Sequence, residues 1–202
     1  RRIAEKKPVV AVMGQLATSA GYMTAIGADW IVARDGTITG SIGVILQTPE
    51  ITELLEKLGI KMTIVKSSPL KALPNPFEKF TDKAREATQA VVTDMYNMFV
   101  AMVVERRKME RARVLELSDG RIYTGRQAKA NGLIDALGGL DTAREWLELN
   151  HKVARDLPLR RRTADEDFGW SWMARALFGR NAALVERVSL DGLVSVWHPS
   201  LR

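Results

Sequence analysis

The sequence predicts an α/β protein in which a parallel β-sheet is covered by helices. Short apolar runs alternate with helical segments along residues 8–65, among them "PVVAVM", "WIVA" and "SIGVIL". Short runs that are apolar throughout are typical of strands buried on both faces of a parallel sheet. Strand, helix and strand in repeated succession favour right-handed crossovers, with the helices packed on the sheet.

The first half of the sequence is expected to contain four strands and two short helices. The strands are predicted at residues 8–13, 30–33, 41–46 and 60–65, and the helices at 19–27 and 51–59. The second helix has its apolar residues on one face, and Gly59 stands where a C-cap glycine belongs. Both helices are expected to cover the sheet.

The second half is expected to be mainly helical. Three prolines indicate a loop before Thr81 or Asp82, either of which can cap a long helix that runs to about Lys108. An apolar stripe on this helix is formed by Ala84, Val91, Met95, Met98, Phe99 and Met102. We interpret the stripe as core or as a subunit interface rather than as a ligand site. Thr124 is expected to cap a helix over residues 125–132, and one more amphipathic helix follows.

Composition divides the chain into a sheet domain, residues 1–154, and an extension, residues 155–202. The extension is rich in charge and then in aromatic residues, so we expect it to be helical or partly ordered and to pack on a domain or a subunit. An interfacial helix at a membrane is the alternative. The first residues resemble the last turn of a helix, so further elements, with any membrane anchor among them, are expected upstream.

Residue usage excludes several kinds of chemistry. The chain of 202 residues has no cysteine and two histidines, which removes thiol nucleophiles and disulfides and argues against a zinc site. Its formal net charge of +6 is compatible with an anionic partner. The basic residues are spread along the chain, however, and aromatic residues do not interleave with them as they do in single-strand binding surfaces. Nucleic-acid binding is therefore not expected.

Ser19, at the start of the helix predicted at 19–27, allows two interpretations. A serine in this place is most often an N-cap, whose hydroxyl accepts a hydrogen bond from a backbone N–H. It is also where a strand-to-helix turn can display a nucleophile, with the backbone N–H of Ala20 placed to stabilise an oxyanion. The surrounding residues lack the G-x-S-x-G form of a nucleophile elbow. The local pattern leaves both interpretations open.

A nucleophilic serine needs a base, and the scarcity of histidine leaves the lysines as candidates. A lysine serves as a base where apolar surroundings lower its pKa. Lys71 has such neighbours in "SSPLKALPNPF", whereas Lys66 continues a strand alternation and is expected to face solvent. Ser68 and Lys71 also have the S-x-x-K spacing of penicillin-binding proteins, but the S-D-N and K-T-G partner motifs are absent.

Several motifs in one order resemble the signal peptide peptidase A family of serine-lysine peptidases, of the S49 type. "KPVVAVMGQLATSAGYMTA" is similar to the family pattern K-P-V-x-A-x-M-x-x-x-A-A-S-G-G-Y-Y-x-A, and "TGSIGV" is identical to a second motif. "IVKSSPLKALPNPF" and "DGRIYTGRQAKANGLIDALGG" resemble two more. The resemblance extends from about Lys7 to Leu147.

The resemblance implies a role for five residues. Ser19 is the expected nucleophile and Lys71 the expected general base. Ser41 matches the family serine that hydrogen-bonds the lysine amine and holds it in place. The backbone N–H of Ala20 is the expected oxyanion donor, and Tyr22 is expected at the substrate site. No metal or organic cofactor is expected for this chemistry.

The resemblance also implies a fold, a substrate and a location. The expected fold is of the ClpP/crotonase kind, here without its N-terminal strands, because the family's upstream S-P-G-G segment has no match. The expected enzyme is a ring-like homo-oligomer that hydrolyses remnant signal peptides or other short hydrophobic peptides. It is anchored in a bacterial inner membrane by an upstream segment, with the catalytic domain on the periplasmic side. A non-catalytic membrane-associated scaffold, or a peptidase with another protein substrate, is the alternative.

Overall fold

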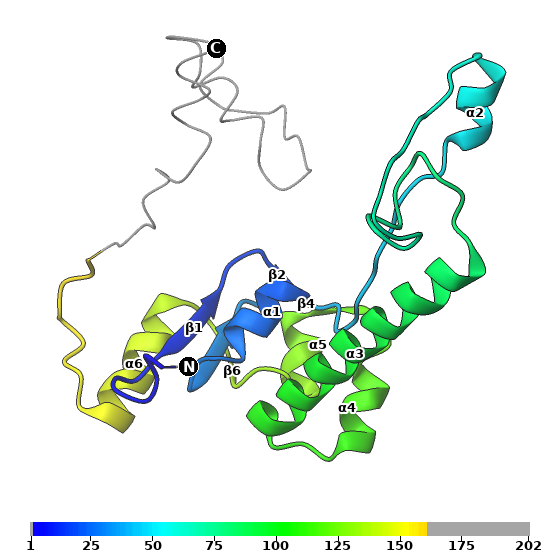
Figure 1. Cartoon of the computed structure of the whole chain (residues 1–202). Coiled ribbons are helices and arrows are strands. Elements are labelled where there is room, and N and C mark those ends of the chain that lie inside the picture. Colours follow the sequence, from blue (N-terminus) through cyan, green and yellow to red (C-terminus); the bar gives the residue numbers. More distant parts are fainter. Residues whose placement is uncertain (1, 161–202) are drawn as a thin grey trace, which may run out of the picture. The chain divides into compact units, whose positions relative to one another are not determined.

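The structure is a computed structural model, and it describes residues 2–160 of the chain. The chain divides into two units, Arg1–Asp156 and Leu157–Arg202. The first unit contains every helix and strand described below (Figure 1). The extension predicted over residues 155–202, with its helical or interfacial character, lies almost entirely outside the described residues.

Two small sheets form the centre of the first unit. One joins β1 (Val10–Met13), β3 (Trp30–Ala33) and β6 (Ala136–Leu137) in the order β1-β3-β6, with both pairs parallel. The other joins β2 (Leu16–Thr18), β4 (Ile38–Gly40) and β5 (Ile122–Thr124). In this sheet β2 and β4 are parallel, whereas β4 and β5 are antiparallel. The predicted α/β class with parallel pairing is confirmed, and the antiparallel pair is an addition to it.

Helices pack around these sheets and beyond them. They are α1 (Ala20–Ala25), α2 (Thr52–Lys57), α3 (Asp82–Arg107), α4 (Arg111–Leu117), α5 (Gly125–Ala130) and α6 (Leu140–His151). The Thr81 hydroxyl accepts a hydrogen bond from the backbone N–H of Ala84 and so caps α3. Thr124 and Gln127 form a capping box at α5. The Thr124 cap is confirmed, and of the two residues expected to cap the long helix, Thr81 is the cap; each hydroxyl satisfies a backbone donor that the helix leaves unpaired.

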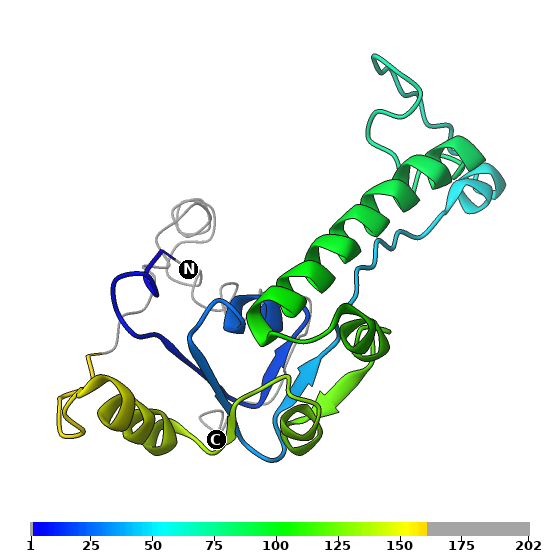
Figure 2. The ribbon, with the colours of Figure 1, turned by 90° about the horizontal axis from the view of Figure 1, so that it is seen from below.

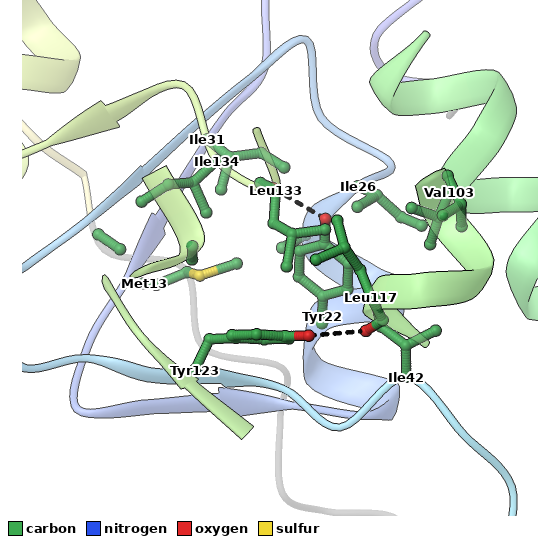
Figure 3. Packing of buried hydrophobic residues seen from close by; sticks show 14 of the residues in the cluster. Met13, Tyr22, Ile26, Ile31, Ile42, Val103, Leu117, Tyr123, Leu133 and Ile134 are labelled. Carbon is green, nitrogen blue, oxygen red and sulfur yellow. Dashed lines mark hydrogen bonds between the residues drawn. The ribbon is translucent and has the colours of Figure 1, made fainter. Parts of the chain in front are cut away.

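The hydrophobic core lies where α1, α3 and the sheets meet (Figure 3). Tyr22 of α1 and Phe99 of α3 are both fully buried, and their ring centroids are 6.5 Å apart. Two tyrosine hydroxyls in this core donate to backbone carbonyls, Tyr22 to Leu133 and Tyr123 to Leu117. Each hydroxyl is thereby satisfied inside an apolar environment, where an unpaired one would be costly.

The predictions for residues 41–65 are wrong in detail. Residues 41–46 and 60–65 form no strand, and β4 lies just before the first of these runs. The helix α2 does form, but none of its residues is buried, and Figures 1 and 2 place it far from the sheets at the outer end of α3. Ile45 is 81% exposed and Val65 is 95% exposed. Ile42, in the first run, is fully buried in the core, whereas residues 60–65 are all exposed and have no covering layer within the first unit.

The apolar stripe of α3 is also divided. Ala84 and Phe99 are buried as predicted, but Val91, Met95 and Met98 are exposed. By length and apolar composition, α3 could cross a membrane, and only 17% of its most apolar window is buried in the unit. Its buried residues Phe99, Val100 and Val103 belong to the hydrophobic core, so we describe α3 as a helix of the domain.

Candidate active site

Ser19 occupies a sharp strand-to-helix turn between β2 and α1. Its backbone has φ 50° and ψ −116°, a conformation that residues other than glycine rarely adopt. Within the described residues its side chain makes no capping hydrogen bond, although it stands at the N-cap position of α1. The ordinary N-cap interpretation is therefore excluded. A strained turn that displays a free hydroxyl is the geometry of a nucleophile elbow, and it forms here without the G-x-S-x-G sequence.

Ser41 lies beside Ser19 because the two residues follow neighbouring parallel strands. Thr18, the last residue of β2, is in register with Gly40, the last residue of β4. The Ser19 backbone N–H donates to the Gly40 carbonyl at 2.8 Å, and the Ser41 backbone N–H donates to the Arg121 carbonyl at 2.8 Å. The carboxyl ends of parallel strands are where α/β proteins place their ligand sites. Both serines therefore stand at the edge where a site is expected.

The two serines share a cavity of about 770 Å³. It is lined by Ser19, Ala20, Met23, Ser41, Gly43, Val44, Ile45, Met95, Tyr96, Met98, Ser118, Asp119 and Gly120. This volume is within the range of small-molecule and peptide side-chain sites, and one wall is largely apolar. The backbone N–H of Ala20 lies in the first turn of α1, directly after Ser19.

Asp119 is a charged residue at the rim of this cavity. The Arg121 guanidinium donates to its carboxylate, and this hydrogen bond holds the pKa of the Asp119 carboxyl below its usual value. Asp119 therefore stays ionised and neutralised by Arg121 near pH 7, which suits a structural partner better than a base for Ser19. Among the described residues, no cluster of three or more histidine, aspartate or glutamate side chains is arranged to hold a metal ion.

Lys71 does not line the Ser19 cavity in this chain. It is exposed, in the proline-rich segment between α2 and α3, where its backbone N–H donates to the Ser68 carbonyl in a turn. That turn does not continue into a helix, so Ser68 and Lys71 are not presented on a helical surface as the S-x-x-K alternative requires. Lys66, expected to face solvent, instead forms an ion pair with Glu78 and is half-buried. Ser19, Ala20 and Ser41 are thus brought together, and Lys71 is not.

The expectation that Tyr22 contacts substrate is not met in this structure. Tyr22 is three positions after Ser19 on α1; it points into the core (Figure 3), and it is not among the residues that line the cavity. Its hydroxyl donates to the Leu133 carbonyl at 2.8 Å, and burial raises the pKa of this hydroxyl well above its ordinary value. Tyr22 fixes α1, and with it Ser19, on the core.

Sequence reasoning did not identify several residues of the cavity. Ser118 was not singled out, Asp119 and Gly120 appeared only within a family motif, and Met95 and Met98 were assigned to core or to a subunit interface. The repeat of methionines three residues apart was visible in the sequence. What the sequence did not reveal was which side of α3 faces Ser19, since that depends on how the helix crosses the sheets.

Comparison with known proteins decides the family. Residues 1–154 match the family model of Peptidase family S49. The chain belongs to peptidase family S49. The resemblance to the S49 family, drawn from the sequence motifs, is thereby confirmed.

Three relatives illustrate what the S49 chain is similar to. A Synechocystis protein described as a candidate protease is 40% identical over 146 residues, which are 72% of this chain and 53% of that protein. An Enterococcus faecium protein described as a candidate signal peptide peptidase SppA is 35% identical over 170 residues, 84% of this chain and 49% of that protein. The chloroplastic serine protease SPPA of Arabidopsis thaliana is 36% identical over 142 residues, 70% of this chain and 21% of that protein. The S49 chain thus spans about half the length of such relatives, or less.

Two solved structures are similar to the S49 chain with a TM-score of 0.40. One is an enoyl-CoA hydratase/isomerase family protein of Hyphomonas neptunium, with 19% identity, covering 92% of this chain and 48% of that one. The other is a serine-to-alanine mutant of a membrane-bound stomatin-specific protease, with 17% identity, covering 68% of this chain and 54% of that one.

Proposed function

We propose that this S49 chain is a serine endopeptidase in which Ser19 is the nucleophile and Lys71 the general base. The observation that carries the proposal is the strained backbone of Ser19, which holds an uncapped hydroxyl at the edge of the cavity. Backbone strain of this kind costs about 1–3 kcal/mol, and it persists where function requires the geometry. Membership of a peptidase family supports the same conclusion.

The proposed reaction needs one proton transfer before bond formation. The neutral amine of Lys71 takes the proton from Ser19 Oγ, and the oxygen attacks the carbonyl carbon of a peptide bond. The Ala20 backbone N–H stabilises the resulting oxyanion, and the Ser41 hydroxyl accepts a hydrogen bond from the lysine amine and orients it. The lysine returns the proton to the leaving amine, and water then hydrolyses the acyl-enzyme to release the second product.

Because Lys71 does not line the cavity in this structure, it has to reach Ser19 from outside the cavity. We propose that a second copy of the chain supplies it, in a homo-oligomer. The segment that carries Lys71 exposes apolar side chains, including Ile64, Val65 and Phe77, and such side chains are expected to be covered by another protein surface. A neighbouring copy that covers this segment would thereby place its own Ser19 close to the Lys71 that the segment carries.

The proposed substrates are remnant signal peptides or other short hydrophobic peptides. The apolar wall of the cavity suits an apolar side chain, and one relative carries the description of a signal peptide peptidase. Because such peptides remain in the bilayer after cleavage from their proteins, the proposal includes a position at a membrane, on the extracytoplasmic side.

Hydrolysis of a fluorogenic hydrophobic peptide tests the proposal. We expect Ser19→Ala and Lys71→Ala each to lower kcat by at least roughly a thousandfold, as loss of a nucleophile or its base does. Lys61→Ala, which removes another exposed lysine of the same segment, is the matched control and should keep full activity. A fluorophosphonate probe should label the native chain and leave Ser19→Ala unlabelled.

Two outcomes would contradict the proposal. Equal hydrolysis rates for the native chain and for both variants would show that Ser19 and Lys71 do not form a catalytic dyad. A native chain that neither hydrolyses peptide nor reacts with the probe would favour the non-catalytic scaffold.

A further inference from the structure

The cavity beside Ser19 has a wall that the proposed mechanism does not use. We propose that Met95 and Met98 of α3 receive the apolar side chain of the bound peptide, and that their flexibility gives the site a broad preference among large apolar side chains. This inference rests on the proposed function of the Ser19 cavity. It assigns the methionines a role in specificity, in place of the core or interface role that the sequence suggested.

The position of the two methionines supports this role. Met95 and Met98 are three residues apart, so they lie on one face of α3, and both line the cavity that Ser19 lines. They are 44% and 47% exposed, which excludes them from the core of the unit. Met23, on the helix that begins after Ser19, adds a third thioether to the same cavity.

The helix backbone under these methionines is fixed although their side chains are not. Tyr96, between them, donates its hydroxyl to the Ser118 carbonyl at 2.9 Å. Phe99 and Val100, which follow, are fully buried in the core. The wall therefore has a defined place relative to Ser19, and only its surface can change shape.

Flexible methionine side chains on a fixed backbone predict that the site accepts apolar peptide side chains of different shapes. Methionine is unbranched and has three rotatable bonds, so it fits apolar partners of different shape, and methionine-rich surfaces are used where one site accepts many ligands. Leucine has nearly the same volume but is branched and stiffer. Replacing both methionines with leucine should preserve the apolar surface and remove its adaptability.

Peptide binding without turnover tests the inference independently of catalysis. In a Ser19→Ala chain, we expect fluorescent peptides that differ only by Leu, Met, Phe or Ala at the variable position to give similar Kd values for the three large residues. The Ala peptide should bind roughly tenfold more weakly, the scale expected for missing methylenes in an apolar site. Met95→Leu with Met98→Leu should widen the spread among Leu, Met and Phe to roughly tenfold.

Two further variants complete the test. Met95→Ala with Met98→Ala should weaken all three large peptides and leave the Ala peptide unchanged. Met62→Leu is the matched control, because Met62 is similarly exposed but does not line the cavity, and it should change no Kd. Unchanged relative Kd values in both double variants would overturn the methionine wall. Failure of the native chain to hydrolyse these peptides would instead count against the proposed function, because the binding comparison does not depend on hydrolysis.

Discussion

Ser19 combines a strained backbone conformation with a hydroxyl that, in the described part of the chain, makes no capping hydrogen bond. Its positive φ places Cβ against the backbone, a cost that glycine avoids because it has no Cβ. The neighbouring hydrogen bond from its N–H to the Gly40 carbonyl holds the turn in place. The strain is therefore kept by the sheet, and it is a property of this position rather than of the local sequence.

Substitution at Ser19 should separate stability from activity. We expect the free energy of unfolding of the Ser19→Gly variant to be about 1 kcal/mol higher than that of Ser19→Ala, because glycine relieves strain that alanine retains. Both variants lack the hydroxyl and should be inactive, and urea unfolding measures the difference.

The same pair of substitutions at Ser118 serves as the control for Ser19. The backbone of Ser118 has φ −111°, a conformation open to every residue. There the glycine variant should be the less stable of the two. A Ser19→Gly chain no more stable than Ser19→Ala would mean that the turn is not strained.

At the scale of elements, residue patterns predicted the parts that are locally determined. The caps at Thr81 and Thr124 depend on a hydroxyl and the next three residues; Thr124 was predicted, and Thr81 was one of two residues expected at its position. The strands expected at 41–46 and 60–65 were wrong because, within the described residues, neither run pairs with a neighbouring strand, although Ile42 is buried, and residues 60–65 also lack a covering layer. Strand pairing and a covering layer are long-range features, which a run itself does not contain.

The candidate site follows the same division. The position of Ser19 between a strand and a helix was predictable from the local sequence. Ser41 was singled out by a family motif alone, because the strand was expected to begin at Ser41, whereas β4 ends just before it. The exposure of Lys71 and the burial of Tyr22 were not predictable, because each depends on how a helix or a loop crosses the sheets.

Gly40 connects β4 to the site and is the place to test that element. It has φ 80°, and a Cβ there would lie 2.6 Å from Cδ2 of the Tyr123 ring and 3.1 Å from the Arg121 carbonyl oxygen. Gly40→Ala should lower the free energy of unfolding by about 1–3 kcal/mol. It should also lower kcat, because β4 has to shift and Ser41 moves with it.

Gly36→Ala is the matched control for Gly40, since a Cβ at Gly36 meets no atom within 4 Å. This variant should keep both stability and activity. A Gly40→Ala chain as stable and as active as Gly36→Ala would show that Tyr123 can move aside freely.

At the scale of the whole molecule, the proposed oligomer makes a prediction about mixtures. Ser19→Ala keeps the lysine and Lys71→Ala keeps the nucleophile, so each alone should be inactive. If a neighbouring copy supplies the base, random co-assembly of the two should recover roughly a quarter of native activity, because one site in four then pairs an intact serine with an intact lysine.

A mixture of Ser19→Ala with the Ser19→Ala, Lys71→Ala double variant is the control and should remain inactive. Absence of recovery in the first mixture, with co-assembly verified by sedimentation, would place both groups of the dyad on one chain.

The two backbone hydrogen bonds at Ser19 and Ser41 have a consequence for how the site tolerates mutation. They join the ends of β2, β4 and β5 through peptide groups, which every substitution except proline preserves. The spacing of the two hydroxyls is therefore set by the ladder of the sheet and only indirectly by core packing. Substitutions in the core are therefore expected to lower the stability of the fold more readily than they change the alignment of the two serines. The sequence around the site can diverge while the positions of Ser19 and Ser41 at the sheet edge are kept.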